Sequence, residues 1–156
     1  MNNKWPDYWM TMAENTAQLS KDPRTKVGAV IVKNKKLKSI GYNGAPEGFP
    51  DEKVPKDNTG TRLIDKKNTF MCHAELNAVL NYEGHLTDLK GSDVYLTLSP
   101  CTTCTCMLSQ LKIKRIIYKT LYDKEEVTEA SKYIIETNKN PMELIDFETF
   151  KERETK

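Results

Sequence analysis

The spacing of apolar and polar positions changes along the chain, and these changes predict the helices and strands. In residues 7–19 apolar side chains recur at the three- and four-residue spacing of a helix with one apolar stripe. The predicted stripe consists of Tyr8, Trp9, Met12, Ala13, Thr16 and Ala17. Pro23 follows, and proline neither continues a helix nor favours helical geometry in the residue before it. Residues 27–32 are a β-branched run, and a polar turn and a second short strand at 37–43 complete a predicted hairpin.

Helical and extended patterns alternate in the second half of the chain. Helices are predicted at 73–82, 102–112 and 125–139, the last with Val127, Ala130, Tyr133, Ile134 and Thr137 on one face. Strands are predicted at 93–98, at 115–118 and around 142–147. Strands that alternate with helices after an opening hairpin favour an α/β fold, a three-layer α/β/α sandwich with a central mixed five-stranded sheet. A length of 156 residues fits a single domain over 1–156.

One long segment, at about 44–69, has no clear period. It contains three prolines, three glycines and many charged residues. A loop of this length inside a compact domain is uncommon and is often functional. We therefore expect an insertion that covers a ligand.

Composition and charge narrow the classes of function. With 24 basic and 22 acidic residues the net charge is +2, which argues against nucleic acid as a partner held by charge alone, although a local basic patch stays possible. A small ligand fits better. No apolar run approaches the roughly 20 residues of a membrane helix, so no membrane partner is expected. The N-terminus lacks the pattern of a secretory signal, which predicts a cytoplasmic protein with reduced cysteines.

Three side chains have the spacing of metal ligands. Cys101 and Cys104 are three positions apart after Pro100, which favours the start of a helix, so both thiols would lie on one face. A helix N-terminus lowers the pKa of a thiol and prepares it to bind zinc. His73 is the natural third ligand, because His85 has no partner pattern. Three protein ligands leave a fourth tetrahedral position for water, as in catalytic zinc sites.

Glu75 lies two residues after His73 and is the predicted proton carrier. Zinc lowers the pKa of a bound water towards about 7, and Glu75 would take its proton without binding the metal. The alternative is a structural zinc knuckle or a reduced cysteine pair. The Glu after the His, the Pro before the first Cys and their order along the chain favour the catalytic interpretation.

Two further thiols are expected to take no part in metal binding. Cys106 lies about 200 degrees round the helix axis from Cys104, and Cys72 would point elsewhere as the chain turns into a helix. Buried free cysteine is the expected state of both, because cysteine packs as a small hydrophobe.

The HxE and PCxxC motifs together resemble the signature of zinc-dependent nucleobase deaminases. Five segments of the chain extend the likeness, in order and over about two thirds of its length. They are "KDPRTKVGAVIV", "GYNGAPEGF", "CHAELNAVLN", "VYLTLSPCTTC" and "IKRIIYKTLYD". On these segments the chain resembles the deoxycytidylate (dCMP) deaminases of the zinc-dependent cytidine/deoxycytidylate deaminase family. The resemblance implies a cytidine deaminase-like fold, one zinc per subunit held by His73, Cys101 and Cys104, and conversion of dCMP to dUMP, which supplies thymidylate synthesis.

The same resemblance suggests substrate contacts. Asn43 would hydrogen-bond the sugar, with a plain turn asparagine as the alternative. Tyr122 matches a family tyrosine near the substrate, or is an ordinary aromatic at a strand end. For the phosphate, Arg24 and Lys26 are best placed, with Arg62 and Arg115 as competitors and solvated surface charge as the alternative for each.

Regulation and assembly are also implied by the resemblance alone. Family members are often homohexamers activated by dCTP and inhibited by dTTP, with magnesium accompanying the triphosphate. The effector would lie on Asn43, Gly44, Pro46 and Gly48, where glycine lets backbone approach a ligand closely, or this segment is a plain surface loop. The second, structural zinc of some relatives is not expected, because residues 1–71 contain no Cys or His. Competing functions are deamination of tRNA adenosine or of a free cytidine nucleoside, and a non-catalytic zinc or nucleotide-binding module.

Overall fold

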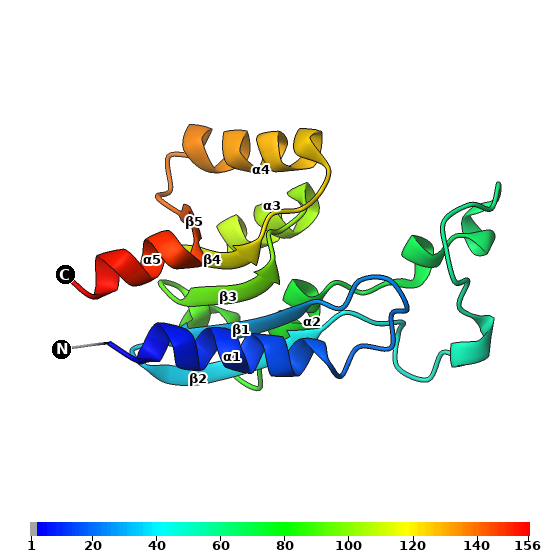
Figure 1. Ribbon diagram of the computed structural model, residues 1–156, viewed down its shortest axis with the longest axis horizontal. Helices are drawn as coiled ribbons and strands as arrows, with labels where there is room; N and C mark the ends of the chain where they lie inside the picture. Colours follow the sequence, from blue (N-terminus) through cyan, green and yellow to red (C-terminus); the bar gives the residue numbers. More distant parts are fainter. Residues whose placement is uncertain (1–2) are drawn as a thin grey trace.

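A mixed five-stranded sheet forms the centre of the computed structural model, which describes residues 3–156 (Figure 1). Its strands are β1 (Gly28–Lys33), β2 (Lys36–Tyr42), β3 (Asp93–Leu98), β4 (Arg115–Thr120) and β5 (Glu143–Asp146). Their order is β2-β1-β3-β4-β5, with β1 antiparallel to both neighbours and β3, β4 and β5 mutually parallel. The predicted α/β class, the opening hairpin and the five mixed strands are confirmed.

The hairpin turns at Asn34 and Lys35, whose φ angles are 53° and 57°. Two consecutive left-handed residues match the twist of the flanking strands, as in tight two-residue hairpin turns. The polar segment between the apolar runs is therefore a turn, as its composition predicts.

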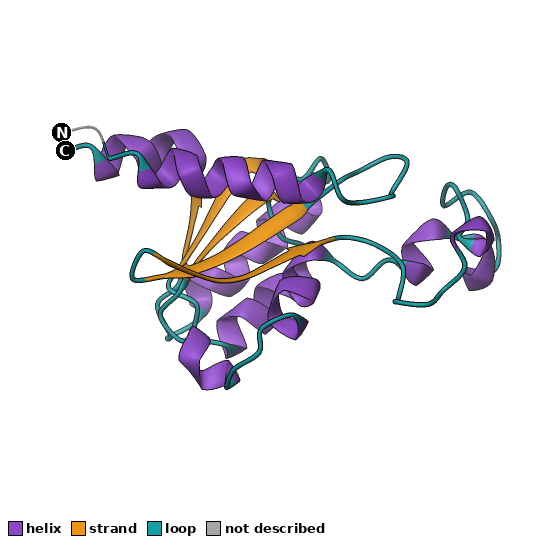
Figure 2. Ribbon diagram, turned by 90° about the horizontal axis from the view of Figure 1, so that it is seen from below, coloured by secondary structure: helices purple, strands orange, loops and turns teal. Residues whose placement is uncertain are grey.

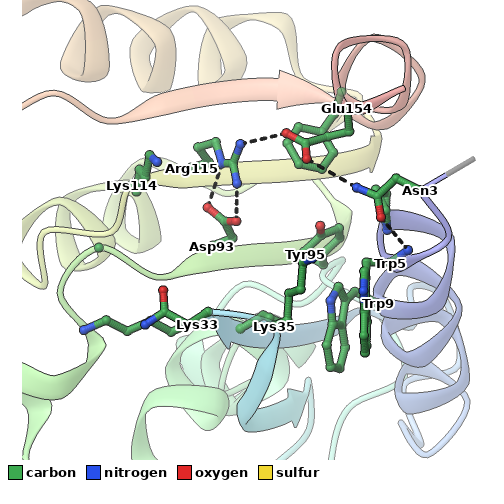
Figure 3. A pocket seen from close by; sticks show the side chains of 15 residues that line it. Asn3, Trp5, Trp9, Lys33, Lys35, Asp93, Tyr95, Lys114, Arg115 and Glu154 are labelled. Atoms are coloured by element: carbon green, nitrogen blue, oxygen red, sulfur yellow. Dashed lines mark hydrogen bonds and ion pairs between the residues drawn. The ribbon is translucent and has the colours of Figure 1, made fainter. Parts of the chain in front are cut away.

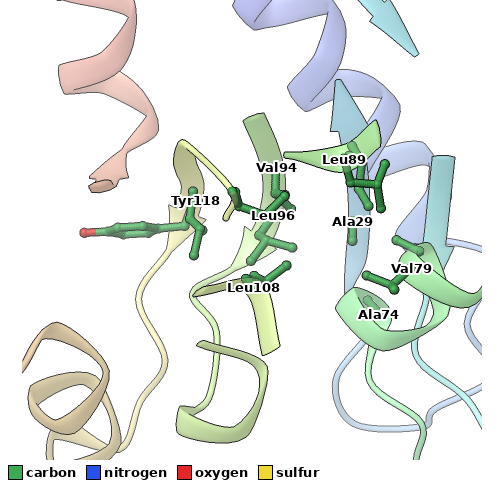
Figure 4. Close-up of a cluster of buried hydrophobic side chains, with 12 residues drawn as sticks. Ala29, Ala74, Val79, Leu89, Val94, Leu96, Leu108 and Tyr118 are labelled. Atoms are coloured by element: carbon green, nitrogen blue, oxygen red, sulfur yellow. The ribbon is translucent and has the colours of Figure 1, made fainter. Parts of the chain in front are cut away.

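Helices cover both faces of the sheet, which gives the three layers (Figure 2). α1 (Trp5–Ala17) and α5 (Phe147–Glu154) lie on one face, and α2 (Ala74–Leu80) and α3 (Thr102–Gln110) lie on the other, where α4 (Glu125–Thr137) packs outside α3. Alternate residues of β1 enter different cores, because successive side chains of a strand point to opposite faces. Ala29 (Figure 4) and Ile31 pack towards α2 and α3, and Val30 and Val32 pack towards α1.

Two predicted helix faces are partly wrong. Tyr8 is 53% exposed, and its ring packs edge-on against Trp9, while Met10 is buried in its place. On α4, Tyr133 is 68% exposed, and the buried side chains are Ser131 and Ile135. The hydroxyl of Ser131 donates a hydrogen bond to a main-chain carbonyl, so a polar residue lies on the inner face and the apolar count alone misplaces it.

α2 approaches strand β2 unusually closely. A Cβ on Gly41 would lie 2.2 Å from the backbone nitrogen of Ala78 and 2.4 Å from the carbonyl oxygen of Ala74. From the same helix, the Asn77 side chain donates to the carbonyl of Tyr42 at 2.7 Å, and the side chain of the C-cap residue, Asn81, donates to that of Ile40 at 3.0 Å. The absence of a side chain at Gly41 lets α2 pack directly on the backbone of β2.

The long loop forms an arm, residues 45–71, which projects away from the sheet in both views (Figures 1 and 2). It contains three short 3-10 turns, η1 (Asp51–Lys53), η2 (Leu63–Asp65) and η3 (Lys67–Phe70); a fourth, η4 (Leu86–Leu89), lies before β3. The base of the arm is closed by main-chain hydrogen bonds between Gly44 and Cys72, at 3.1 and 2.7 Å. Within residues 3–156, no helix has the length and apolar character required to cross a membrane.

Candidate metal centre and active site

The three candidate metal ligands come from the N-termini of two helices. His73 is the N-cap residue of α2 and follows Cys72, whose backbone is paired with Gly44. Cys101 is the N-cap residue of α3, which begins after β3 and Pro100. Both N-cap residues have extended backbone, with ψ of 153° and 171°. The first turn of α3 then brings Cys104 to the same side as Cys101.

The distances among the ligand atoms fit a zinc ion. His73 Nδ1 lies 3.4 Å from Cys101 Sγ and 3.5 Å from Cys104 Sγ, and all three atoms lie within 4.8 Å of one another. Tetrahedral zinc with ordinary Zn–N and Zn–S bonds separates a nitrogen from a sulfur by about 3.6 Å. Cys104 is buried, whereas His73 is exposed, so the cluster is accessible from solvent. The donor set therefore fits a three-ligand zinc centre with one open position.

The pKa values of the two thiols are shifted in opposite directions. The pKa of Cys101 is lowered to about 4, mainly by a hydrogen bond from the Cys104 thiol. A hydrogen bond from His73 and the backbone N–H of Cys104 lower it further. The neighbouring sulfur of Cys101, together with burial, raises the pKa of Cys104. His73, hydrogen-bonded to Cys101, has a raised pKa. Cys101, at the start of α3 beside a backbone N–H and a histidine, is thus the thiol that ionises more readily, and the thiolate is the form of cysteine that binds metal.

Glu75 lies in the first turn of α2 with only 4% of its surface exposed. Burial raises the pKa of its carboxyl, which the charge of His73 and a hydrogen bond from Cys104 partly offset. An ordinary surface carboxylate has neither this burial nor these neighbours. Glu75 is therefore placed to hold a proton beside the three ligands.

The remaining thiols lie outside the ligand cluster. Cys72 is half-buried and Cys106 is exposed. The expectation that Cys106 is buried is wrong, because the face of α3 opposite the cluster is open to solvent at this position. Its expected separation from the ligands agrees with the structure.

Tyr122 follows the carboxyl end of β4, beside the end of β3 that leads into Cys101. Its backbone N–H donates to the hydroxyl of Ser99 at 2.8 Å, and Ser99 N donates to the carbonyl of Thr120 at 2.8 Å. Because β3 and β4 are parallel, their carboxyl ends lie side by side. Tyr122 is thus brought close to Cys101, and its side chain is half-exposed.

Arg24 and Lys26 are exposed in the loop between α1 and β1. Asn43, at the end of β2, is only 7% exposed. Its side-chain oxygen accepts a hydrogen bond from Val27 N at 2.8 Å, and its amide nitrogen donates to the carbonyl of Thr25 at 2.8 Å. Asn43 therefore shapes the backbone of the loop that presents the two cations.

The competing cations are engaged elsewhere. Arg62 forms two hydrogen bonds with Asp65, three residues along the arm. Arg115 binds Asp93 through two nitrogens and also reaches Glu154, in a pocket near the amino ends of β3 and β4 (Figure 3). Cys101 and Cys104 of the ligand cluster follow the opposite, carboxyl end of β3. Arg115 is therefore remote from the candidate active site.

The predicted effector segment follows Asn43 at the base of the arm. Both backbone polar groups of Gly44 are bonded to Cys72, while Pro46 and Gly48 are exposed. Gly48 has a φ of 82°, a left-handed conformation that favours glycine. The segment thus starts beside Cys72, the residue before His73, and leads into the arm.

Sequence reasoning missed Asp22, Lys67 and Ser99. Asp22 and Lys67 form a buried ion pair between the loop and the arm, and Ser99 links the chain before Cys101 to Tyr122. A serine before the PCxxC motif and an Asp-Pro step were visible signals for Ser99 and Asp22. No local pattern distinguishes Lys67 from the exposed lysines around it.

Together, the three-layer fold, the three ligands at two helix N-termini and the buried carboxylate define a zinc-site enzyme of the hydrolytic deaminase class. Residues 3–120 match the family model described as "Cytidine and deoxycytidylate deaminase zinc-binding region". The chain belongs to this family.

Individual relatives agree with this assignment. The deoxycytidylate deaminase of Homo sapiens is 42% identical over 130 residues, which are 81% of this chain and 72% of that protein. The probable deoxycytidylate deaminase of Drosophila melanogaster is 33% identical over 166 residues, 96% of this chain and 81% of the other. A crystal structure of dCMP deaminase from cyanophage S-TIM5, in complex with dCMP and dUMP, superimposes with a TM-score of 0.70. It is 26% identical, and the match covers 94% of this chain and 98% of that one.

Proposed function

We propose that the chain catalyses the hydrolytic deamination of dCMP to dUMP, with release of ammonia, and so supplies thymidylate synthesis. The observation that carries the proposal is the buried Glu75 beside His73, Cys101 and Cys104, because a purely structural zinc site has no use for a buried carboxyl group. The relatives named deoxycytidylate deaminase and the dCMP and dUMP complex of the cyanophage enzyme support the choice of substrate.

Proton transfer is the proposed task of Glu75. One zinc ion per subunit, held by His73, Cys101 and Cys104, would supply Lewis-acid chemistry that makes water a nucleophile near neutral pH. Glu75 accepts the proton of the water that attacks the amino-bearing carbon, donates it to the ring nitrogen and then assists the departure of ammonia. A buried carboxyl with a raised pKa suits this role, since it must both take and return a proton.

The remaining predicted contacts recognise the phosphate and the sugar of the nucleotide. Arg24 and Lys26 bind the phosphate, because both are exposed on a loop fixed by Asn43. Asn43 offers the sugar the second lone pair of its side-chain oxygen, the first being used by Val27. Tyr122, whose backbone is bonded to Ser99, lines the substrate site.

Regulation is proposed at the base of the arm. dCTP, with magnesium, activates and dTTP inhibits by binding at Asn43, Gly44, Pro46 and Gly48, where the left-handed Gly48 lets backbone approach a triphosphate. The proposed assembly is a cytoplasmic homohexamer. An assay of dCMP turnover with and without each triphosphate tests the regulation, and failure of dTTP to inhibit would show that it is wrong.

A comparison of Glu75→Gln with the unaltered chain tests the catalytic assignment. Glutamine keeps the shape of the side chain but cannot shuttle a proton, so we expect turnover to fall by about 10²- to 10⁴-fold with zinc content and folding near normal. An active Glu75→Gln protein would contradict the mechanism.

Substrate choice is tested by turnover of dCMP, deoxycytidine and an adenosine-containing RNA stem-loop. Preference for dCMP supports the phosphate contacts, and equal rates on dCMP and deoxycytidine would refute them. Turnover of the stem-loop alone would identify a tRNA-type deaminase, and no turnover of any substrate would favour a non-catalytic module.

A further inference from the structure

A buried ion pair joins the arm to the loop before β1. Lys67 Nζ, from the arm, lies 2.8 Å from each carboxylate oxygen of Asp22. The exposed fractions of the two side chains are 5% and 3%, and among the ion pairs of residues 3–156 it is the only one in which both side chains are buried. Burial of two charges is costly unless further hydrogen bonds satisfy them, so the other partners of Asp22 are informative.

Asp22 accepts three more hydrogen bonds. Its Oδ1 accepts the backbone N–H groups of Arg24 at 2.8 Å and of Thr25 at 3.1 Å, and its Oδ2 accepts the Asn43 amide at 3.3 Å. A carboxylate can accept all of these bonds only while it is ionised. Lys67 supplies the counter-charge that keeps Asp22 ionised in this buried position.

The arm holds Lys67 in place from the other side. The backbone N–H of Lys67 donates to the carbonyl of Asp57 at 2.8 Å, and Phe49 packs against Phe70 with ring centroids 4.9 Å apart. Two residues beyond Phe70, Cys72 is paired with Gly44 and leads directly into His73. The ion pair thus connects the segment that leads into His73 to the loop that carries Arg24 and Lys26.

We propose that Lys67 is a positioning residue for the substrate's phosphate: through Asp22 it fixes the backbone of the Arg24–Lys26 loop, without touching the substrate. This inference rests on the proposed function. An apolar pair of the same volume would also fasten the arm, but it could not organise the N–H groups of the loop. The ion pair therefore contributes to nucleotide recognition in addition to holding the arm.

Kinetics of Lys67→Met on two substrates test the inference. Methionine fills a similar volume without charge, so KM for dCMP is expected to rise about 10-fold or more, as for the loss of one charge-assisted hydrogen bond, with kcat changed by less than about 3-fold. kcat/KM for deoxycytidine, which lacks the phosphate, is expected to stay within about 3-fold of the unaltered enzyme. Lys67→Arg keeps the charge and is expected to retain most of the affinity for dCMP. Lys56→Met, at an exposed arm lysine, is the control for loss of a charge.

Equal losses on dCMP and deoxycytidine, or a loss in kcat alone, would overturn the inference, since a merely structural role affects both substrates alike. Zinc content is measured in each variant to exclude damage to the metal centre. If Lys67→Met does not fold, Lys67→Gln, whose amide still donates to Asp22, carries the same test and is expected to show a smaller rise with the same substrate preference.

Amide hydrogen exchange gives a readout independent of activity. In Lys67→Met the N–H groups of Arg24, Thr25 and Val27 should exchange faster, while those of β3 keep their protection. Unchanged protection at these three amides would refute the positioning role. If the unaltered chain deaminates neither cytosine substrate, the proposed function fails, and the exchange measurement alone decides whether Lys67 orders the loop.

Discussion

Gly41→Ala tests how strictly the contact between α2 and β2 positions the catalytic groups. The added Cβ would lie 2.2 Å from Ala78 N, 2.4 Å from Ala74 O and 2.8 Å from Ala78 Cα. All three are backbone atoms, so no side-chain rotation relieves the overlap. To restore ordinary contact at about 3.4 Å, α2 must retreat by about 1 Å.

The expected cost has a structural and a catalytic part. Overpacking of this kind destabilises by about 1–3 kcal/mol, and a backbone obstacle places Gly41→Ala near the upper end. For a chain of this length, about 3 kcal/mol corresponds to a fall in Tm of about 6–12 °C. α2 carries Glu75 and begins after His73, and a displacement of about 1 Å can reduce turnover by about 10²-fold.

Thermal unfolding, urea unfolding and dCMP turnover are measured side by side. Gly44→Ala is the matched control for stability, because a Cβ there meets nothing within 4 Å, and it should change stability by less than about 0.5 kcal/mol. If Gly41→Ala unfolds at the same midpoint as Gly44→Ala, the close approach of helix and strand does not constrain the protein and the reasoning is refuted.

Three further predictions address the metal, the pH dependence and the core. Cys104→Ser should lose zinc while Cys106→Ser keeps it, as measured by metal analysis; equal zinc in both would remove Cys104 from the ligand set. Burial opposes ionisation of Asp22, but Lys67 and two backbone N–H groups outweigh this effect and lower the pKa of Asp22. The ionised Asp22 therefore contributes fully to the free energy of unfolding above about pH 4, the pKa of an aspartate in the unfolded chain. This contribution is lost as the pH falls towards the lower pKa of the folded state. Urea unfolding at several pH values should show that the free energy of unfolding declines less steeply below pH ~4 in Asp22→Asn than in the unaltered chain. Parallel declines in the two proteins would contradict the assignment. Within the described residues the Ser92 hydroxyl is fully buried and has no hydrogen-bond partner, so Ser92→Ala should leave stability unchanged or raise it by about 1 kcal/mol; a clear fall in Tm would indicate an interaction with this hydroxyl.

The fold was predictable where the sequence pattern is local. The hairpin, the strand at 93–98 and the start of α3 all follow from short runs of apolar residues or from Pro100. Helix α5 was missed because six of its eight residues, Phe147–Glu154, are polar or charged, and only Phe147 and Phe150 are buried. The side chain of Asp146 accepts a hydrogen bond from Thr149 N, an N-cap signal that could have located the helix.

The residues of the candidate site were likewise predictable only where the signal is local in the sequence. His73, Glu75, Cys101 and Cys104 were predictable because each pair lies within one motif at a helix N-terminus. Lys67 was not, because its partner Asp22 is 45 positions away in the sequence and its neighbours in the chain are polar. A buried charge is defined by tertiary contacts, which the pattern of one segment does not contain.

Asn77 of α2 and Asn81, the C-cap residue of this helix, have a consequence for self-association. β2 is an edge strand, and the unpaired carbonyl groups of such an edge are a template for strand addition by another chain. The two asparagines donate to the carbonyls of Tyr42 and Ile40 and so occupy these two acceptors. At the opposite edge, β5 has only four residues. An added strand would thus lose two of its acceptors at β2 and would find only a short partner at β5, so neither edge of the sheet favours β-augmentation.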